Sequence, residues 1–74
     1  MSDDTYELED IVFVTETTDA ILVRLEDVDE EDAELHEDQW WIPKSLIESQ
    51  DVYRPGDTGY VEVPEWFASK EGMA

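Results

Sequence analysis

The residues of this sequence that could do chemistry are its carboxylates. The chain of 74 residues contains 22 Asp and Glu, and two carboxyl groups held at a fixed separation can act as general acid and base. Acid pairs recur along most of the chain, so no pair stands out as catalytic. The one histidine, His36, lies in a run of acids without a helix or strand pattern, where a catalytic base would be poorly held. We therefore expect a protein that is not an enzyme and needs no cofactor.

A calcium site is the second chemistry that the acids suggest. Between Asp27 and Asp38, acids at alternate positions resemble the start of a calcium-binding loop. The position that needs glycine for the sharp turn is Asp32, and the final position is Asp38 rather than Glu. We therefore predict no specific metal site, only diffuse attraction of cations.

The charge balance excludes several classes of partner. A formal net charge of −18, with only four Lys and Arg, has the wrong sign for direct binding to nucleic acid or to an anionic membrane. The N-terminal residues are acidic where a secretory leader is basic and then apolar, and no apolar run approaches the ~20 residues of a membrane span. We expect a cytoplasmic protein, acting as a monomer or weak homodimer.

The apolar pattern predicts a sheet that would position these acids. Residues 6–25 are expected to form a β-hairpin, with Tyr6, Leu8, Val12 and Val14 on one face of its first strand and Glu7 and Glu9 on the other. Further strands are expected at 39–42, ending before Pro43, and at 60–63, with a helical turn at 44–47 and a Pro- and Gly-containing turn at 54–59. Residues 64–71 have the end signals of a helix, which Trp66 and Phe67 would pin to the sheet.

These elements predict an α+β fold that is dominated by β-structure. It would be a small curved antiparallel sheet, or a partly open barrel of SH3-like or OB-like type, with one C-terminal helix. Residues 6–74 would form this single domain after a disordered tail at 1–5, and residues 26–38 would form an extended acidic loop.

Two short motifs resemble a known group of proteins. Trp41-Ile42-Pro43-Lys44-Ser45 and Val63-Pro64-Glu65-Trp66-Phe67-Ala68, followed by Gly72, look like the core of short uncharacterised proteins that recur in bacteriophage and prophage genomes. The resemblance covers roughly residues 18–72. It departs at 26–38, where the acidic segment replaces a tight turn. The resemblance implies a phage-type origin but no activity.

The acids are the candidate binding site for a basic nucleic-acid-binding protein, whose groove they would enter as a mimic of phosphates. Residues 26–38 hold nine acids and residues 1–10 hold five, a clustering that favours mimicry by an inhibitor or modulator, including anti-defence proteins. Trp40 and Trp41 are neighbours on a strand and must point to opposite faces, so one could be an exposed anchor, unless both are covered. The candidate partner-binding residues are Asp27, Asp29, Glu30, Glu31, Asp32, Glu34, Glu37, Asp38, Glu7, Glu9, Trp40 and Trp41.

The density of acids also fits two roles that involve no mimicry. The acids could be an adaptation to high salt (halophilic adaptation), in which a small β-barrel domain with an unrelated structural or assembly role keeps its surface hydrated. Alternatively, the loop could be a merely solvated excursion of the surface. Salt adaptation predicts an even coat of acids, whereas mimicry predicts a patch.

Overall fold

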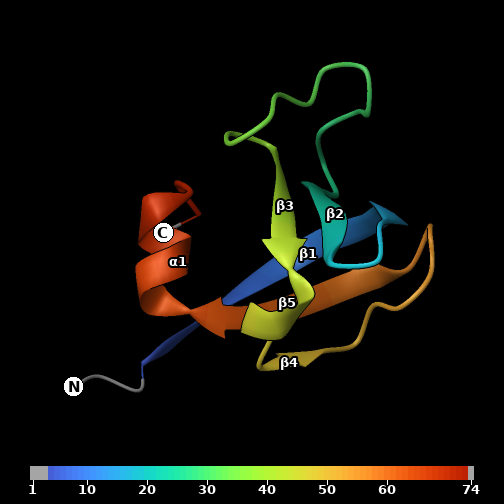
Figure 1. Cartoon of the computed structure of the whole chain (residues 1–74). Helices are drawn as coiled ribbons and strands as arrows, with labels where there is room; N and C mark the ends of the chain where they lie inside the picture. The colour runs from blue at the N-terminus through green and yellow to red at the C-terminus, as the bar shows by residue number, and fades with distance from the viewer. Residues whose placement is uncertain (1–3, 74) are drawn as a thin grey trace.

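The computed structural model describes residues 4–73 and contains one antiparallel sheet and one C-terminal α-helix (Figure 1). The five strands lie in the order β3-β2-β1-β5-β4, and the sheet is not closed. This confirms the predicted β-dominated α+β fold. The elements are β1 (Thr5–Glu16), β2 (Ala20–Leu25), β3 (Gln39–Pro43), a 3₁₀ turn η1 (Lys44–Leu46), β4 (Ser49–Gln50), β5 (Thr58–Pro64) and α1 (Glu65–Lys70).

Strand β1 is the centre of the sheet, and it changes face at Asp10. Leu8 is buried as expected, but beyond Asp10 the buried side chains are Ile11 and Phe13. The register with β5 shifts between Leu8 and Ile11, and Asp10 has a φ of 56°. An extra residue in a left-handed conformation, which Asp tolerates, makes a β-bulge that reverses the inward face. The prediction that Val12 and Val14 share a face with Tyr6 and Leu8 is therefore wrong.

The two halves of β1 pair with different strands. Its first half pairs with β5 and its second half mainly with β2, and a second register shift lies between Phe13 and Thr15 on the β2 side. Bulges bend and twist a strand. Figure 1 shows the resulting strong twist, with β3 running steeply across the direction of β1 and β5.

Most predicted elements are confirmed with small changes in their bounds. The hairpin loop closes where Thr17 Oγ1 accepts a hydrogen bond from the Ala20 N–H at 3.1 Å. β3 includes Pro43, which lies opposite Ala20, and β5 starts two residues earlier than expected. β4 was not predicted. Because β1 begins at Thr5, the expected tail of residues 1–5 does not include Thr5, and residues 1–3 lie outside the described residues.

The core lies between the curled sheet and α1. Its fully buried side chains come from β1, β2, β3 and β5 and from the segment that follows β4; the largest are Phe13, Ile11, Ile42, Val23, Val52, Val61 and Val63. Phe67 and Ala68 of α1 are buried with them, whereas Trp66 is 60% exposed and meets Phe67 edge-on at a centroid distance of 5.9 Å. Phe67 therefore pins the helix, as predicted, and the same prediction for Trp66 is wrong. Adjacent helical residues point in directions about 100° apart. The buried side of α1 carries Phe67 and Ala68, and Trp66 lies at its exposed margin.

Candidate acidic binding surface

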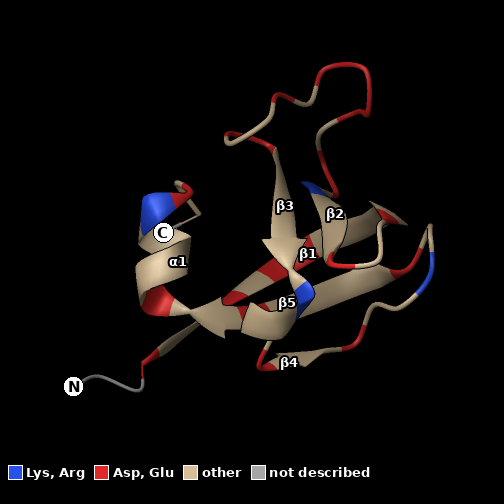
Figure 2. Cartoon of the chain, viewed as in Figure 1, with Lys and Arg blue, Asp and Glu red and all other residues tan. Residues whose placement is uncertain are grey.

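Loop 26–38 is tied to the sheet at its base and exposed at its tip. The Leu25 N–H donates to Asp38 O at 2.8 Å, and the Glu26 N–H donates to Asp10 O at 2.8 Å. Arg24 Nη1 donates to the carbonyl of Val28. The tip, Asp29 to Asp32, closes as a turn in which all four acids are exposed. Figure 2 shows acidic positions along most of this loop.

The second half of the loop is held against the C-terminal end of the chain. His36 Nδ1 lies 2.9 Å from Glu71 Oε1, and the indole N–H of Trp40 donates to the Glu71 carbonyl at 2.8 Å. Within the loop, the Glu34 carbonyl accepts from the N–H of Asp38 at 2.8 Å. The predicted loop is thus anchored at both ends, and His36 is an anchor rather than a purely solvated side chain.

A second group of acids lies on the sheet, on the outer side of β1 and β5. Glu7 of β1 faces Glu62 of β5 directly in the strand register, and the charge of Asp51 also acts on Glu7. The sequence identified Glu7 and Glu9 as outward-facing but missed Glu62 and Asp51. Glu62 alternates with the buried Val61 and Val63, so its outward face was predictable. Its position opposite Glu7 was not, because it depends on pairing between strands far apart in the sequence.

Asp10 joins the two groups of acids. Its carbonyl accepts from Glu26 at the base of the loop, and Asp10, Glu26 and Asp27 line a shallow cavity of about 410 Å³. Acidic residues are therefore found from the end of β4 and from β5 across β1 to the base of the loop. We call this surface the acidic band; it comprises Asp51, Glu62, Glu7, Glu9, Asp10 and the loop acids Glu26, Asp27, Asp29, Glu30, Glu31, Asp32, Glu34, Glu37 and Asp38.

The crowding of carboxylates in the band raises the pKa of two of its acids, Glu7 and Glu37. A hydrogen bond with Glu9, partial loss of water and the charges of Glu9, Glu62 and Asp51 raise the pKa of Glu7. A hydrogen bond with Glu34, followed by the charges of Glu34 and Asp38, raises the pKa of Glu37. Neighbouring carboxylates disfavour each other's ionised form. Among residues 4–73, no group of three or more potential ligands is arranged to hold a metal ion.

The two adjacent tryptophans point to opposite faces, as predicted. Trp40 is buried, with 2% of its surface exposed, while Trp41 is 38% exposed. Trp41 lies opposite Leu22 on the outer face of β2 and β3. The alternative in which both tryptophans are covered is therefore wrong, and Trp41 is the one available as an anchor.

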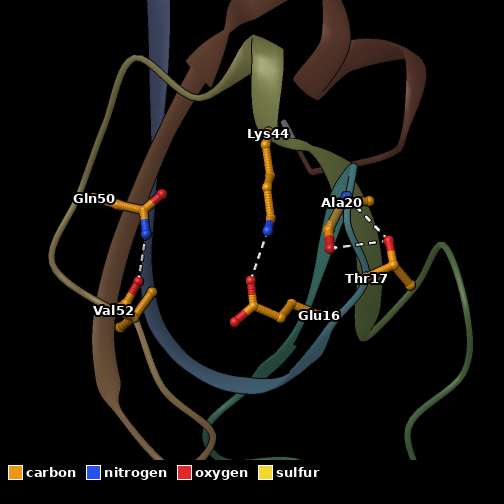
Figure 3. A network of polar contacts seen from close by, with 6 residues as sticks. All are labelled: Glu16, Thr17, Ala20, Lys44, Gln50 and Val52. Atoms are coloured by element: carbon orange, nitrogen blue, oxygen red, sulfur yellow. Dashed lines mark hydrogen bonds and ion pairs between the residues drawn. The ribbon is translucent and has the colours of Figure 1, made fainter.

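The cations lie outside the band or serve the structure. Lys44 Nζ contacts Glu16 Oε1 at 2.6 Å and ties η1 to the end of β1 (Figure 3). Arg24 supports the base of the loop through Val28. Arg54 lies in the turn before β5, where its N–H donates to Asp57 Oδ2 at 3.0 Å. The acids of the band therefore have no ion pair with Lys or Arg within residues 4–73.

The fold and surface together define a small β-rich domain with one continuous acidic band. A scan against models of protein families found no match, and searches of curated proteins and of solved structures found none either. Within residues 4–73 no helix is long and apolar enough to cross a membrane.

Proposed function

We propose that this protein is a non-enzymatic, phage-type inhibitor or modulator that places its acidic band in the basic groove of a nucleic-acid-binding protein. The band would occupy the Lys and Arg side chains that otherwise neutralise phosphates, so that DNA or RNA is displaced. The resemblance of its Trp-Ile-Pro-Lys-Ser and Val-Pro-Glu-Trp motifs to phage proteins supports this origin.

The observation that carries the proposal is the placement of Glu7 directly opposite Glu62. Like charges opposite each other on neighbouring strands destabilise a sheet. The same surface adds Glu9 and Asp51 and contains no paired cation among the described residues. A cationic partner would relieve this repulsion, so the arrangement favours the bound state over the free one.

The spacing of these carboxylates suits a row of basic side chains. Acids two residues apart on a strand are separated by about 6.6 Å, and directly opposite residues on neighbouring strands are about 5 Å apart at Cβ. Several partner cations can therefore be contacted at once from one rigid sheet. The loop acids extend the row beyond the sheet, and such complementarity speeds encounter and fixes register.

Trp41 supplies the apolar contact that charge alone lacks. It is 38% exposed beside Leu22, on the strand that follows the acidic loop. Aromatic side chains dominate the energetics of protein interfaces and also stack on Arg guanidinium groups. We therefore assign Trp41 the role of anchor and Trp40 a structural role.

The decisive experiment compares two charge-matched variants. The loop variant carries Asp29→Asn, Glu30→Gln and Glu31→Gln; the control carries Asp19→Asn, Glu48→Gln and Glu65→Gln, which lie outside the band. Proteins captured by the wild-type domain at ~0.1 M salt, where electrostatic partners are retained, would be identified and then challenged with DNA or RNA. We expect a nucleic-acid-binding protein that nucleic acid displaces, that the control variant retains and that the loop variant loses.

Two outcomes would count against the proposal. If both variants lose binding equally, only the total charge matters, and the acids act as a solvating coat of the kind that salt adaptation produces. If the loop variant folds normally and keeps full affinity, the loop is not part of the interface. Trp41→Ala tests the anchor separately and is expected to speed dissociation more than it slows association.

A further inference from the structure

Because the sheet is not closed, it has edges at which the backbone could pair with a further strand. The protein protects two of these edges against such pairing. At the free edge of β3, the Gln39 N–H donates to Glu34 O and the Gln39 carbonyl accepts from the His36 N–H at 2.8 Å. Alternate residues of a strand direct their amides to the same side, so Trp41 and Pro43 also face this edge. Pro43 has no N–H to offer. The edge of β3 is therefore unsuited to the addition of another strand.

The edge at β4 is closed in another way. β4 has only two residues, Ser49 and Gln50, and the Gln50 carbonyl accepts a hydrogen bond from the Tyr53 hydroxyl at 2.9 Å. Very short edge strands are a common protection against unwanted pairing. This edge offers an incoming strand almost no run of backbone.

The first half of β1 has a third edge, and no strand of the sheet pairs with it. The Glu65 N–H donates to Asp4 O at 3.1 Å, which fixes the even-numbered residues of this segment as the ones that bond to β5. The amides of Thr5 and Glu7 therefore point to the opposite side. β2 pairs with β1 only from Ile11 onward, so within residues 4–73 no strand lies against this side. Thr5, Glu7 and Glu9 are all exposed.

We propose that this edge of β1 binds an extended, basic segment of a partner protein, which adds to the sheet as a further strand. The backbone of the segment would pair with the outward amides of Thr5 and Glu7, as in known cases of strand addition. Lys or Arg at alternate positions would fall on the face that carries Glu7 and Glu9 and meet their carboxylates. The occupant follows from charge complementarity, because a neutral or acidic strand would leave the repulsion among Glu7, Glu9, Glu62 and Asp51 unrelieved.

The inference rests on the proposed function and deepens it, because Glu7 and Glu9 belong to the acidic band. It names the form of the partner segment that would bind at the sheet part of the band, apart from the loop and Trp41. Two different groups of atoms would contribute to binding. Backbone pairing at the edge of β1 would align the segment, and the carboxylates of Glu7 and Glu9 would select basic side chains. Contacts between a partner and the loop part of the band, residues 26–38, do not require strand addition at β1.

The test uses a synthetic peptide of about eight residues, with Lys and Thr alternating, and a twin whose backbone amides are N-methylated. The twin has the same charge but cannot pair as a strand. Titrated into ¹⁵N-labelled protein at ~0.1 M salt, the first peptide is expected to bind at least about tenfold more tightly than the twin. The amides of Thr5 and Glu7 should become protected from hydrogen exchange.

Two variants separate the outcomes. Glu7→Gln with Glu9→Gln should weaken the peptide by about tenfold or more, whereas the loop variant with Asp29→Asn, Glu30→Gln and Glu31→Gln should bind it as the wild type does. Equal affinity for both peptides, or protection at Trp41 and the loop instead of β1, would overturn the inference. Because the loop variant keeps this edge, failure here and failure of the proposed function are distinguishable.

Discussion

Glu7 and Glu62 lie opposite each other at the middle of the β1–β5 ladder, and Thr5 Oγ1 donates to Glu62 Oε2 at 2.6 Å. Glu62 is thereby held on the outer face of the sheet beside Glu7, on the strand next to the one that has the unpaired edge. The fold keeps two carboxylates together where it gains nothing from the contact, and this relationship has measurable effects on stability.

Glu7→Gln is expected to stabilise the fold at low salt. The change removes repulsion with Glu9, Glu62 and Asp51 without removing a buried group. The melting temperature should rise by a few degrees in dilute buffer, and the difference should vanish near 1 M salt, where the Debye length falls to about 3 Å. Thermal melts at several salt concentrations measure both effects. Glu48→Gln, outside the band, is the control; an equal gain for that variant would contradict a local origin.

The fold is expected to be most stable at acid pH. The pKa values of Glu7 and Glu37 are raised above 4.5, so the native state binds their protons more tightly than the unfolded chain does. That stabilisation is present below this pH and is lost as the pH rises through the raised values.

Asp57 acts in the opposite direction. The backbone N–H groups of Tyr53 and Arg54 lower its pKa below 3.8, so its contribution is lost as the pH falls through the lowered value. The two trends together predict a maximum of the melting temperature at about pH 4, measured at constant ionic strength. A melting temperature that climbs steadily from there to neutral pH would show that crowding in the band has little energetic weight.

Trp40 and Trp41 should differ sharply when each is replaced by Phe. Trp40→Phe loses the hydrogen bond to the Glu71 carbonyl and leaves a void in the core, at a cost of about 1–3 kcal/mol. Trp41→Phe changes an exposed position and should stay within about 0.5 kcal/mol of the wild type. Denaturant unfolding measures both free energies. Similar costs at the two positions would mean that Trp41 also supports the fold.

Gly59 is expected to be required because of Asp51. A Cβ at position 59 would lie 2.0 Å from Asp51 Oδ1, the atom that accepts from the Tyr60 N–H at 2.8 Å. Gly59→Ala should displace the Asp51 side chain and cost about 1 kcal/mol or more. In an Asp51→Ala background the same change should cost much less, and the double-mutant cycle isolates the coupling. Additive effects would show that Gly59 matters for another reason.

The sequence alone predicted the elements whose signals are local. The hairpin follows from alternation and a short polar loop, and the position of α1 follows from Pro64, Glu65 and Lys70 at its ends. The opposite orientations of Trp40 and Trp41 follow from strand geometry alone. The fold class could be predicted because such local signals add up to a β-rich chain with one terminal helix.

Features that depend on long-range or exceptional geometry were not predictable. A bulge at Asp10 needs one residue in the left-handed region, and nothing in Glu9-Asp10-Ile11 distinguishes it from a regular strand. The anchor between His36 and Glu71 joins residues 35 apart in the chain. For the same reason, only part of the acidic band was predictable. The loop acids form a continuous run in the sequence, whereas Asp51 and Glu62 come close to Glu7 only because the strands pair.

That pairing also orders the events of biosynthesis. Of the five strands of this sheet, β1 is made first, β2 can join the second half of β1 as soon as the hairpin is complete, and β5, at residues 58–64, is made last. Until then the first half of β1 has no partner on either side. Glu7 and Glu9 lie in this segment, which is unpaired until β5 is made. Their charges are expected to make newly made chains repel one another where two unpaired strands could otherwise associate. The charge that destabilises the finished sheet is thus expected to disfavour association of the unfinished one.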